Sequence, residues 1–316
     1  MQLITQVVPD DFNLFLAGDA HEGAIHFCRS SWNKFIDIVR KPFDGVSKNF
    51  VVDHGDCIEA ISTDDKRFDI ETADPEILLA AKSAGRSSKG SYIDRQIESA
   101  INRRKPIFDK IVTLLKGNHE HALWRYTSAA ERIASGLEVR YGTYSAVISY
   151  VDKKGDLLFK HYATHGRRTI GSVADDPVRQ RANMELQLKR YLKNKFGDTL
   201  LNSQGHSHKI LTAKPRPQLY LTTNEGDIGH HYTAARKSRG YIEPNHKWYA
   251  CSGSFLKQYI VGVDGYAERG GYDPVELGCV VCKVRDRQIV DLIELPFSTT
   301  ELKKEPTVFE EPWVQG

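Results

Sequence analysis

The side chains that could do chemistry in this 316-residue sequence stand directly after apolar runs. The clearest example is Leu115–Arg125, LKGNHEHALWR, where an asparagine, two histidines and a glutamate follow the apolar run IVTLL. Residues of metal-binding types follow four further apolar runs, so the candidate ligands are Asp19, His21, Asp56, Asn118, His165, His206 and His208. Any one of these residues alone would be an ordinary polar strand end. Seven of them together favour a metal site.

The types of these residues predict which ions such a site would bind. Four imidazoles, the carboxylates and one amide oxygen form a mixed nitrogen and oxygen donor set, which suits manganese, iron or zinc rather than calcium. No cysteine belongs to the set, so a structural zinc site is not expected. We therefore predict two divalent ions, with manganese favoured and iron or zinc as alternatives. The bridging carboxylate is assigned to Asp56, because it stands alone after its apolar run.

These residues would come together if the strands that precede them end at the same place. The apolar runs predict buried strands over 12–17, 49–53 and 110–115. Apolar residues recur at three- and four-residue steps over 25–39 and 93–101, which predicts two amphipathic helices, the second ending at Pro106. Alternating strands and helices predict parallel pairing. Parallel strands end at one edge of a sheet, where ligands bind in α/β proteins.

The second half of the sequence predicts more antiparallel structure. Two apolar runs within 143–166 have the form of a hairpin, and a basic helix is expected from Pro177, capped by Asp175 or Asp176, to Lys195. Further strand-like runs occur at 198–209, 218–223, 247–255, 279–284 and 289–295. We predict an α/β protein with a two-sheet β-sandwich flanked by helices, in which the first sheet is parallel and the second more antiparallel. It would form a single domain over 1–300, with a helical insertion at about 62–110 and a C-terminal tail at 301–316.

Five ordered motifs resemble those of the calcineurin-like metallophosphoesterase superfamily: GDAH (18–21), GDCIEA (55–60), GNHE (117–120), ATHG (163–166) and GHSH (205–208). The resemblance spans roughly residues 12–212, and a weaker similarity to phage-encoded members covers 250–285. It implies a two-sheet β-sandwich with flanking helices, as expected above. It also implies that one metal is held by Asp19, His21, Asp56 and His208, and the second by Asp56, Asn118, His165 and His206.

The same resemblance implies a reaction. We expect hydrolysis of a phosphodiester by attack of a metal-bridging hydroxide, with His119 and Asp56 as the catalytic residues. His119 would contact the phosphate or protonate the leaving oxygen, and Glu120 would orient His119 or brace its turn. The second motif continues as Ile58-Glu59-Ala60, where Ser/Thr protein phosphatases continue to an Asp-Arg pair, and this difference disfavours a protein-phosphatase role.

The partner is expected to be a phosphate ester, with DNA, RNA or a nucleotide among the candidates. The basic segments 95–105 and 179–195 would follow a nucleic-acid backbone if they border the metal edge, and otherwise they are solvated helix faces. Arg167 and Arg168 would bind a phosphate oxygen or lie in a solvated loop. His230 and His231 are expected in a surface loop. The alternative functions are a phosphomonoesterase acting on a small metabolite or phosphoprotein, and a non-catalytic binding scaffold.

The composition is that of a globular protein, with 40% hydrophobic and 27% charged residues, and the net charge of +3 does not by itself indicate a nucleic-acid binder. Five cysteines, an odd number, argue against a disulfide framework, and Cys279 and Cys282 are expected in the core. Neither a signal peptide nor a membrane-spanning run is predicted, so we expect no membrane partner and a cytoplasmic location, which is the host cytoplasm if the protein is phage-encoded. The sequence carries no signal for an oligomeric state.

Overall fold

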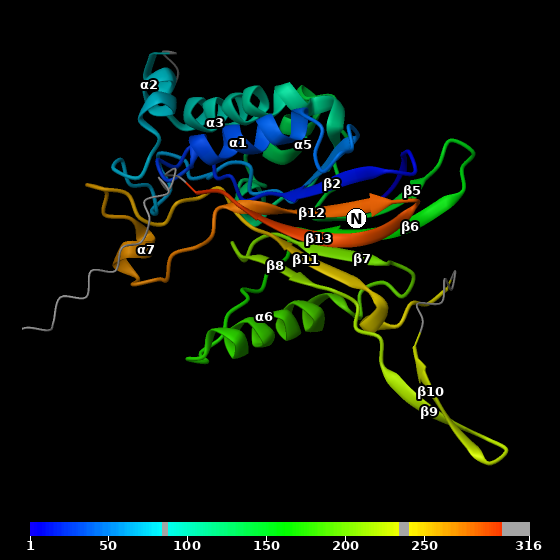
Figure 1. The fold of residues 1–316 in the computed structure, drawn as a ribbon. Coiled ribbons are helices and arrows are strands. Elements are labelled where there is room, and N and C mark those ends of the chain that lie inside the picture. Colours follow the sequence, from blue (N-terminus) through cyan, green and yellow to red (C-terminus); the bar gives the residue numbers. More distant parts are fainter. Residues whose placement is uncertain (84–87, 234–239, 299–316) are drawn as a thin grey trace, which may run out of the picture.

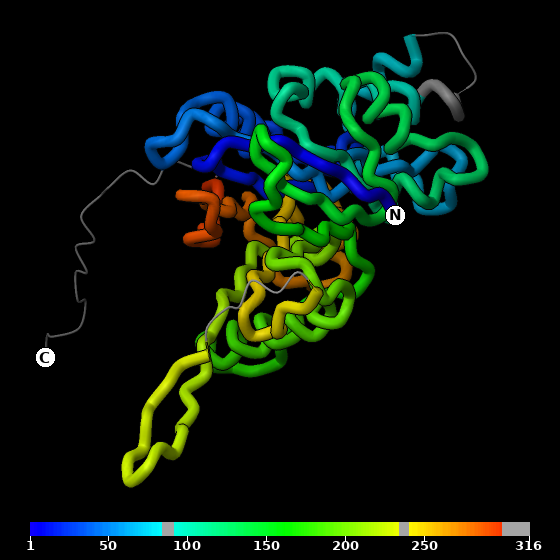
Figure 2. Tube along the Cα trace, turned by 90° about the vertical axis from the view of Figure 1, so that its right-hand side faces the viewer, coloured from blue at the N-terminus to red at the C-terminus, as the bar shows by residue number. Residues whose placement is uncertain are grey.

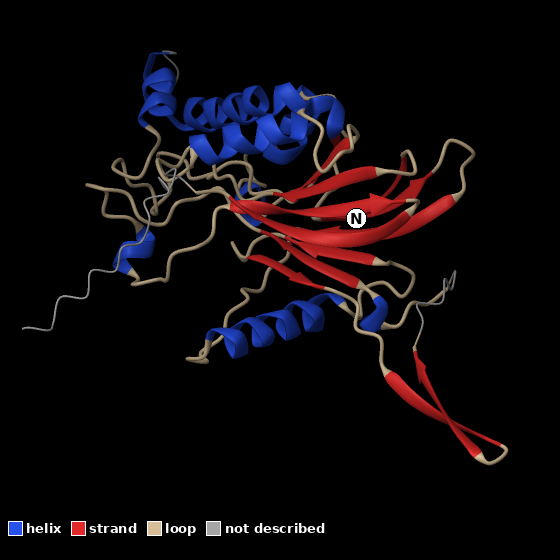
Figure 3. Cartoon of the chain, in the orientation of Figure 1, coloured by secondary structure: helices blue, strands red, loops and turns tan. Residues whose placement is uncertain are grey.

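The computed structural model describes residues 1–83, 88–233 and 240–298, which form a mixed α/β structure with several sheets and flanking helices (Figures 1 and 3). The expected tail at 301–316 lies outside the described residues. Two large sheets lie at the centre, with helices on their outer sides. This arrangement is compatible with the predicted two-sheet sandwich.

The first sheet has five strands and contains the three parallel strands that the sequence predicts. Its order is β13 (Gln288–Pro296), β12 (Gly278–Arg285), β2 (Phe12–Ala17), β3 (Asn49–Asp53) and β4 (Ile111–Leu114). β2, β3 and β4 pair in parallel, whereas β12 pairs antiparallel with both β2 and β13. The prediction of a parallel first sheet therefore applies to half of its strand pairs.

The second sheet has six strands and is less antiparallel than predicted. Its order is β1 (Gln2–Val7), β5 (Ser145–Val151), β6 (Leu157–Thr164), β7 (Leu201–Gln204), β11 (Trp248–Ser252) and β8 (Ile210–Ala213). The predicted hairpin is present as β5 and β6, but β1–β5, β6–β7 and β7–β11 are parallel pairs. The prediction was wrong because partners distant in sequence form these pairs, and local pattern does not report their direction.

The hydrophobic core between the two sheets follows from the alternation of side chains along the strands. Phe12, Leu14 and Leu16 on one face of β2 pack with Tyr150 and Phe159 of the second sheet. Alternate residues of the same strand pack on the other side, beneath the helices.

Cys279 and Cys282 follow the same rule within β12. Both are buried free thiols, and Cys279 joins the core beneath the helices whereas Cys282 joins the core between the sheets. Their expected place in the core is confirmed.

Helices cover the outer face of each sheet (Figure 1). On the side of the first sheet lie α1 (Arg29–Arg40), α2 (Pro75–Ser83), α3 (Ser88–Arg104), the 3₁₀ turn η1 (Lys105–Lys110), α4 (Asn118–Ala122) and α5 (Ala129–Gly136). α1 begins at Arg29, later than the predicted start at residue 25. Ile25 is not helical, because its backbone N–H donates to Thr72 O at 2.9 Å. The regular α-helix of α3 ends at Arg104, before Pro106, as predicted.

On the side of the second sheet, α6 (Pro177–Leu192) begins at the predicted proline. The Asp176 carboxylate caps it by accepting the Arg179 backbone N–H at 2.7 Å. Two short elements, η2 (Pro244–His246) and α7 (Tyr266–Arg269), complete the described helices. Among the described residues, no helix combines the length and apolar character needed to cross a membrane.

A two-stranded hairpin projects from the body of the molecule (Figures 1 and 2). It consists of β9 (Leu219–Asn224) and β10 (Asp227–Tyr232), paired antiparallel. His230 and His231 lie in β10, so the expectation of a surface loop at these residues was wrong. They are exposed on the hairpin and do not line the cavity beside the metal-type residues.

Candidate metal centre

The ends of five strands bring the seven predicted ligands together. Asp19 and His21 follow β2, Asp56 follows β3, and Asn118 follows β4. From the second sheet, His165 follows β6, and His206 and His208 follow β7. The carboxyl ends of these strands therefore meet at one edge of the two sheets, as the sequence predicts.

The backbone at this edge is held in an uncommon conformation. Asp19, His21, Asp56, His206 and His208 have φ values of 53°, 54°, 49°, 68° and 50°, in the left-handed region. Such a conformation is unfavourable for residues with a side chain and is concentrated at functional sites. It turns the chain sharply after each strand, so that side chains from separate strands meet.

Asp19, His21 and His208 form the first group of donor atoms. One donor atom from each lies within 4.8 Å of the others, and the Nε2 atoms of His21 and His208 are 3.2 Å apart. His208 Nε2 is also 3.3 Å from Asp19 Oδ1. The backbone N–H of His206 donates to both Asp19 oxygens at 3.1 Å, and this contact holds the carboxylate in place.

Asp56, His165 and His206 form the second group, and Asn118 joins it. Asn118 Oδ1 lies 2.9 Å from His165 Nε2 and 2.7 Å from His206 Nδ1. Asp56 Oδ2 is 3.2 Å from His165 Nε2 and 3.9 Å from His21 Nε2. Asp56 is therefore the carboxylate that lies between the two groups.

The glycine of the GNHE motif is explained by its closeness to Asp56. A Cβ atom placed on Gly117 would lie 1.9 Å from Asp56 Oδ1, so any larger residue would displace this carboxylate. The backbone N–H of His119 donates to the same Oδ1 at 2.9 Å. The turn after β4 thus fixes the orientation of Asp56.

Hydrogen bonds at the far ring nitrogens orient two of the histidines. His165 Nδ1–H donates to His54 O at 2.8 Å, and His21 Nδ1–H donates to Glu59 Oε2 at 3.0 Å. Both acceptors lack a proton to donate, so each ring directs Nε2 toward the donor groups. Histidines that bind metals are typically held in this way.

The electrostatics of the centre favour a cation. Burial alone would lower the pKa of His165, but the Asp56 carboxylate raises it to about 9. Burial would raise the pKa of Asp56, but His165 and other histidines hold it well below its usual range. An environment that stabilises positive charge beside an ionised carboxylate also stabilises a bound cation. The donor types, their convergence and this environment fit metal ions.

Glu59 is a functional residue that the sequence interpretation missed. Burial would raise its pKa, but His119 and His21 lower it, which keeps the carboxylate ionised. Its carboxylate holds His21, and its backbone oxygen accepts His119 Nδ1–H at 2.7 Å. Glu59, His21 and His119 also form a third cluster of donor atoms. We interpret that cluster as a support, because Glu59 binds His21 through Nδ1 and not through the Nε2 that joins the first group.

Glu120 braces its turn and does not orient His119. Its carboxylate accepts backbone N–H groups of Asp56, Cys57, Ile58 and Gly117. Of the two roles expected for Glu120, the structure has the second.

His119 stands at the first turn of α4, and of its two ring nitrogens only Nδ1 has a hydrogen-bond partner among the described residues. Its Nδ1 is engaged by Glu59 O, and its side chain is 22% exposed and lines the cavity beside the centre. Burial would lower the pKa of His119, but the Glu59 and Asp56 carboxylates raise it. His121 is exposed on the same helix and belongs to none of the donor clusters found among the described residues.

Arg104 is buried beneath the centre and not exposed to a nucleic acid. Its guanidinium donates to Asp53 Oδ2 at 2.8 Å and lies 3.4 Å from Glu22 Oε1, while Arg103 pairs with the same Glu22 at 3.0 Å. Neither interpretation of segment 95–105, a nucleic-acid contact or a solvated helix face, applies to Arg104. The network instead braces the turns after β2 and β3.

Arg167 and Arg168 are exposed beside the centre but outside its cavity. The Arg168 guanidinium lies over the ring of Tyr191, 5.4 Å from its centroid. This contact directs Arg168 to α6. For Arg168 this contact fits phosphate binding less well, and for Arg167 both interpretations stay predictions.

Neither a protein-family model nor a curated protein sequence matches this chain. The candidate site therefore rests on the residues and geometry described above.

Proposed function

We propose that this chain is a dinuclear metal-dependent phosphoesterase related to the calcineurin-like metallophosphoesterases. One observation carries the proposal: seven side chains from five strand ends converge as two donor groups, with Asp56 between them. The first ion would be held by Asp19, His21, Asp56 and His208, and the second by Asp56, Asn118, His165 and His206. Manganese is the favoured metal, with iron or zinc as alternatives.

The arrangement of the fold supports the same assignment. The five motifs lie at the carboxyl ends of β2, β3, β4, β6 and β7, in the order in which the resemblance has them. All seven ligand positions are occupied by residues that can bind a metal. A binding scaffold that had lost catalysis would have no need to keep them.

Two divalent ions bound here would neutralise phosphate charge and activate water at neutral pH. In the hydrolysis, a bond forms from the water oxygen to phosphorus, the bond to the ester oxygen breaks, and the ester oxygen takes a proton. His119 is placed to give that proton. Glu59 O holds Nδ1–H, which leaves Nε2 for a substrate in the cavity that His119 lines, and the nearby carboxylates favour the protonated ring.

The experiment compares metal content with hydrolysis in the parent protein and in Asp56→Asn. We expect two ions per chain in the parent and manganese-dependent hydrolysis of bis-p-nitrophenyl phosphate or p-nitrophenyl phosphate. Asp56→Asn should lose both activity and metal, because a neutral amide does not bridge two cations as a carboxylate does. His121→Ala, an exposed neighbour outside the donor groups, is the control. A fully metal-loaded parent that hydrolyses neither ester would refute the proposal.

A further inference from the structure

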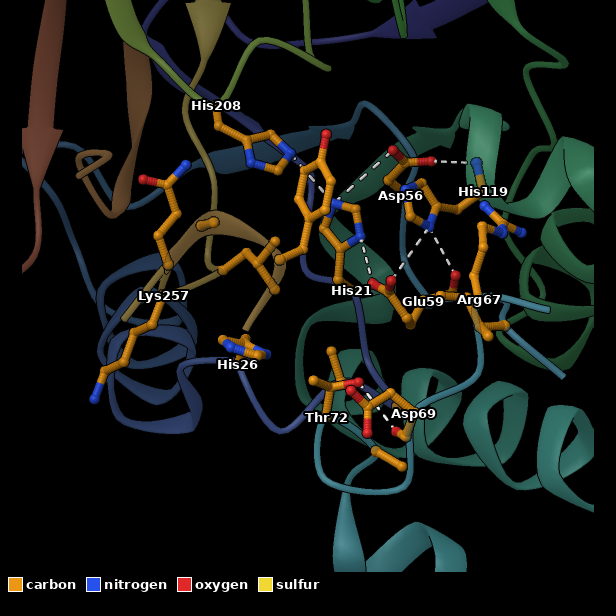
Figure 4. A pocket seen from close by; sticks show the side chains of 18 of the residues that line it. His21, His26, Asp56, Glu59, Arg67, Asp69, Thr72, His119, His208 and Lys257 are labelled. Atoms are coloured by element: carbon orange, nitrogen blue, oxygen red, sulfur yellow. Dashed lines mark hydrogen bonds and ion pairs between the residues drawn. The ribbon is translucent and has the colours of Figure 1, made fainter. Parts of the chain in front are cut away.

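A cavity of about 730 Å³ opens beside the metal centre (Figure 4). His21, Asp56, His119 and His208 line one end, and most of the remaining lining residues come from two walls. The first wall is segment 61–73 with Tyr92, which packs on its Phe68, and the second is segment 256–272. Its volume is within the range of pockets that enclose small molecules. Sequence reasoning gave neither wall segment a role.

Backbone pairing joins the two walls through the segment between His21 and α1. Ala24 forms a β-bridge with Ala73, and Phe27 forms one with Leu256. The Lys257 N–H also donates to His26 O at 2.8 Å. Both walls are therefore attached to the segment that follows the predicted ligand His21.

An ion pair connects the walls away from the metal centre. Arg269 Nη1 of the second wall lies 3.6 Å from Asp69 Oδ2 of the first, and both residues line the cavity. In Figure 4, Asp69 and Thr72 lie at the end opposite Asp56 and His119. A substrate that reaches the metals from this cavity is thus bounded in length, which suits a compact molecule better than a continuous strand.

The first wall offers a cationic group to an anion. Arg67 donates from Nε and Nη2 to the Asp65 carboxylate at 3.0 and 2.8 Å, and among the described residues Nη1 has no hydrogen-bond acceptor. Figure 4 shows its guanidinium directed toward the end of the cavity that holds His119. Asp65 therefore orients Arg67 while leaving one edge for a ligand.

Aromatic rings stand on both walls. Tyr266 and Tyr272 are 71% and 47% exposed, with ring centroids 5.4 Å apart and hydroxyls 3.0 Å apart. Phe68 and Tyr92 pack edge to face on the other wall, 5.9 Å apart. All four line the cavity. Exposed tyrosine rings at a cavity provide flat surfaces on which a planar group can stack.

We propose that the substrate of this centre is a nucleoside phosphate ester of about mononucleotide size, with its phosphate contacted by Arg67 and its base against Tyr266. The proposal rests on the phosphoesterase function proposed above. Of the nucleic acid and the nucleotide among the candidates, it selects the nucleotide, because the cavity has the volume of a small-molecule site, Arg104 is buried and Arg103 pairs with Glu22.

The experiment uses two diesters with the same leaving group, thymidine 5′-(p-nitrophenyl phosphate) and methyl p-nitrophenyl phosphate. With the manganese-loaded full chain, KM for the thymidine ester should be roughly tenfold lower than for the methyl ester. Tyr266→Ala should remove this difference, whereas Tyr232→Ala, a tyrosine of similar exposure (68%) on the projecting hairpin, should retain it. Arg67→Ala should raise KM for both esters by roughly tenfold, and the neighbouring Lys66→Ala should not.

Calorimetry provides a readout that is independent of turnover. Thymidine 5′-monophosphate should bind the manganese-loaded protein and should bind the Tyr266→Ala variant roughly tenfold more weakly. Equal KM values for the two esters in the parent protein would overturn the inference while leaving the phosphoesterase proposal intact. A 20-nucleotide oligothymidylate that competes as well as the mononucleotide would overturn the compact-substrate assignment. If neither ester is hydrolysed, the phosphoesterase proposal fails, and calorimetry still decides whether the cavity binds a nucleotide.

Discussion

Replacing Glu59 should weaken metal binding more than it lowers turnover. The Glu59 carboxylate holds His21 through a contact of 3.0 Å, whereas His119 is held by the Glu59 backbone oxygen. Glu59→Ala removes the first contact and retains the second, and it also removes one of the two carboxylates that raise the pKa of His119. A hydrogen bond to a charged group contributes about 1.5–3 kcal/mol, and the loss of such a partner of a metal ligand typically weakens metal affinity by roughly 10- to 100-fold.

The assay titrates manganese into the metal-free protein and follows both binding and hydrolysis of bis-p-nitrophenyl phosphate. We expect Glu59→Ala to lower the affinity for the ion held by His21 by roughly 10- to 100-fold. At saturating manganese the turnover number should return to within roughly tenfold of the parent, because His119 keeps its backbone acceptor and the Asp56 carboxylate still raises its pKa. Glu59→Gln should bind manganese more tightly than Glu59→Ala, because its amide oxygen still accepts His21 Nδ1–H.

Two results would refute this reasoning. Unchanged manganese affinity in Glu59→Ala would mean that the carboxylate does not support His21. Turnover that stays low at saturating manganese, with both metal sites occupied, would mean that Glu59 acts mainly on the reaction, through the protonation of His119, and not through the ligand His21.

Three further predictions follow from the surroundings of the centre. His119→Ala should lower turnover by roughly 10²- to 10⁴-fold without changing metal content, and loss of metal from this variant would show that His119 is a ligand. Arg104→Met should lower the free energy of unfolding by about 3–5 kcal/mol in urea titrations, because it leaves Asp53 without its buried cationic partner and Glu22 with Arg103 alone. His161 is buried and its pKa is well below 6.5, so as the pH falls the unfolded chain takes up a proton at this residue at a higher pH than the folded protein does. Stability should therefore fall as pH drops below about 6.5, by up to about 1.4 kcal/mol per pH unit from this residue, and urea unfolding of His161→Gln should show a shallower pH dependence.

Much of the secondary structure could be predicted because its signals are local. β2 and β3 match their apolar runs, and Pro177 and Asp176 mark the beginning of α6. Pairing between distant strands was less predictable. β1 lies beside β5, so nothing near β1 in the sequence indicates its partner or direction.

By itself, the sequence determined which residue types could bind metals and the strand ends that they follow, because apolar runs and the polar residues after them are adjacent in the chain. Only the tertiary structure decided how the surrounding residues act. Glu59 reaches His21 across 38 positions, and Arg104 reaches Glu22 across 82, so neither contact leaves a local pattern. The cavity depends on the same kind of contact, because its walls come from separate segments that meet only when the chain is folded. The two arginines also differ in burial: Arg104 is enclosed and holds Glu22 and Asp53, whereas Arg67 lines the cavity.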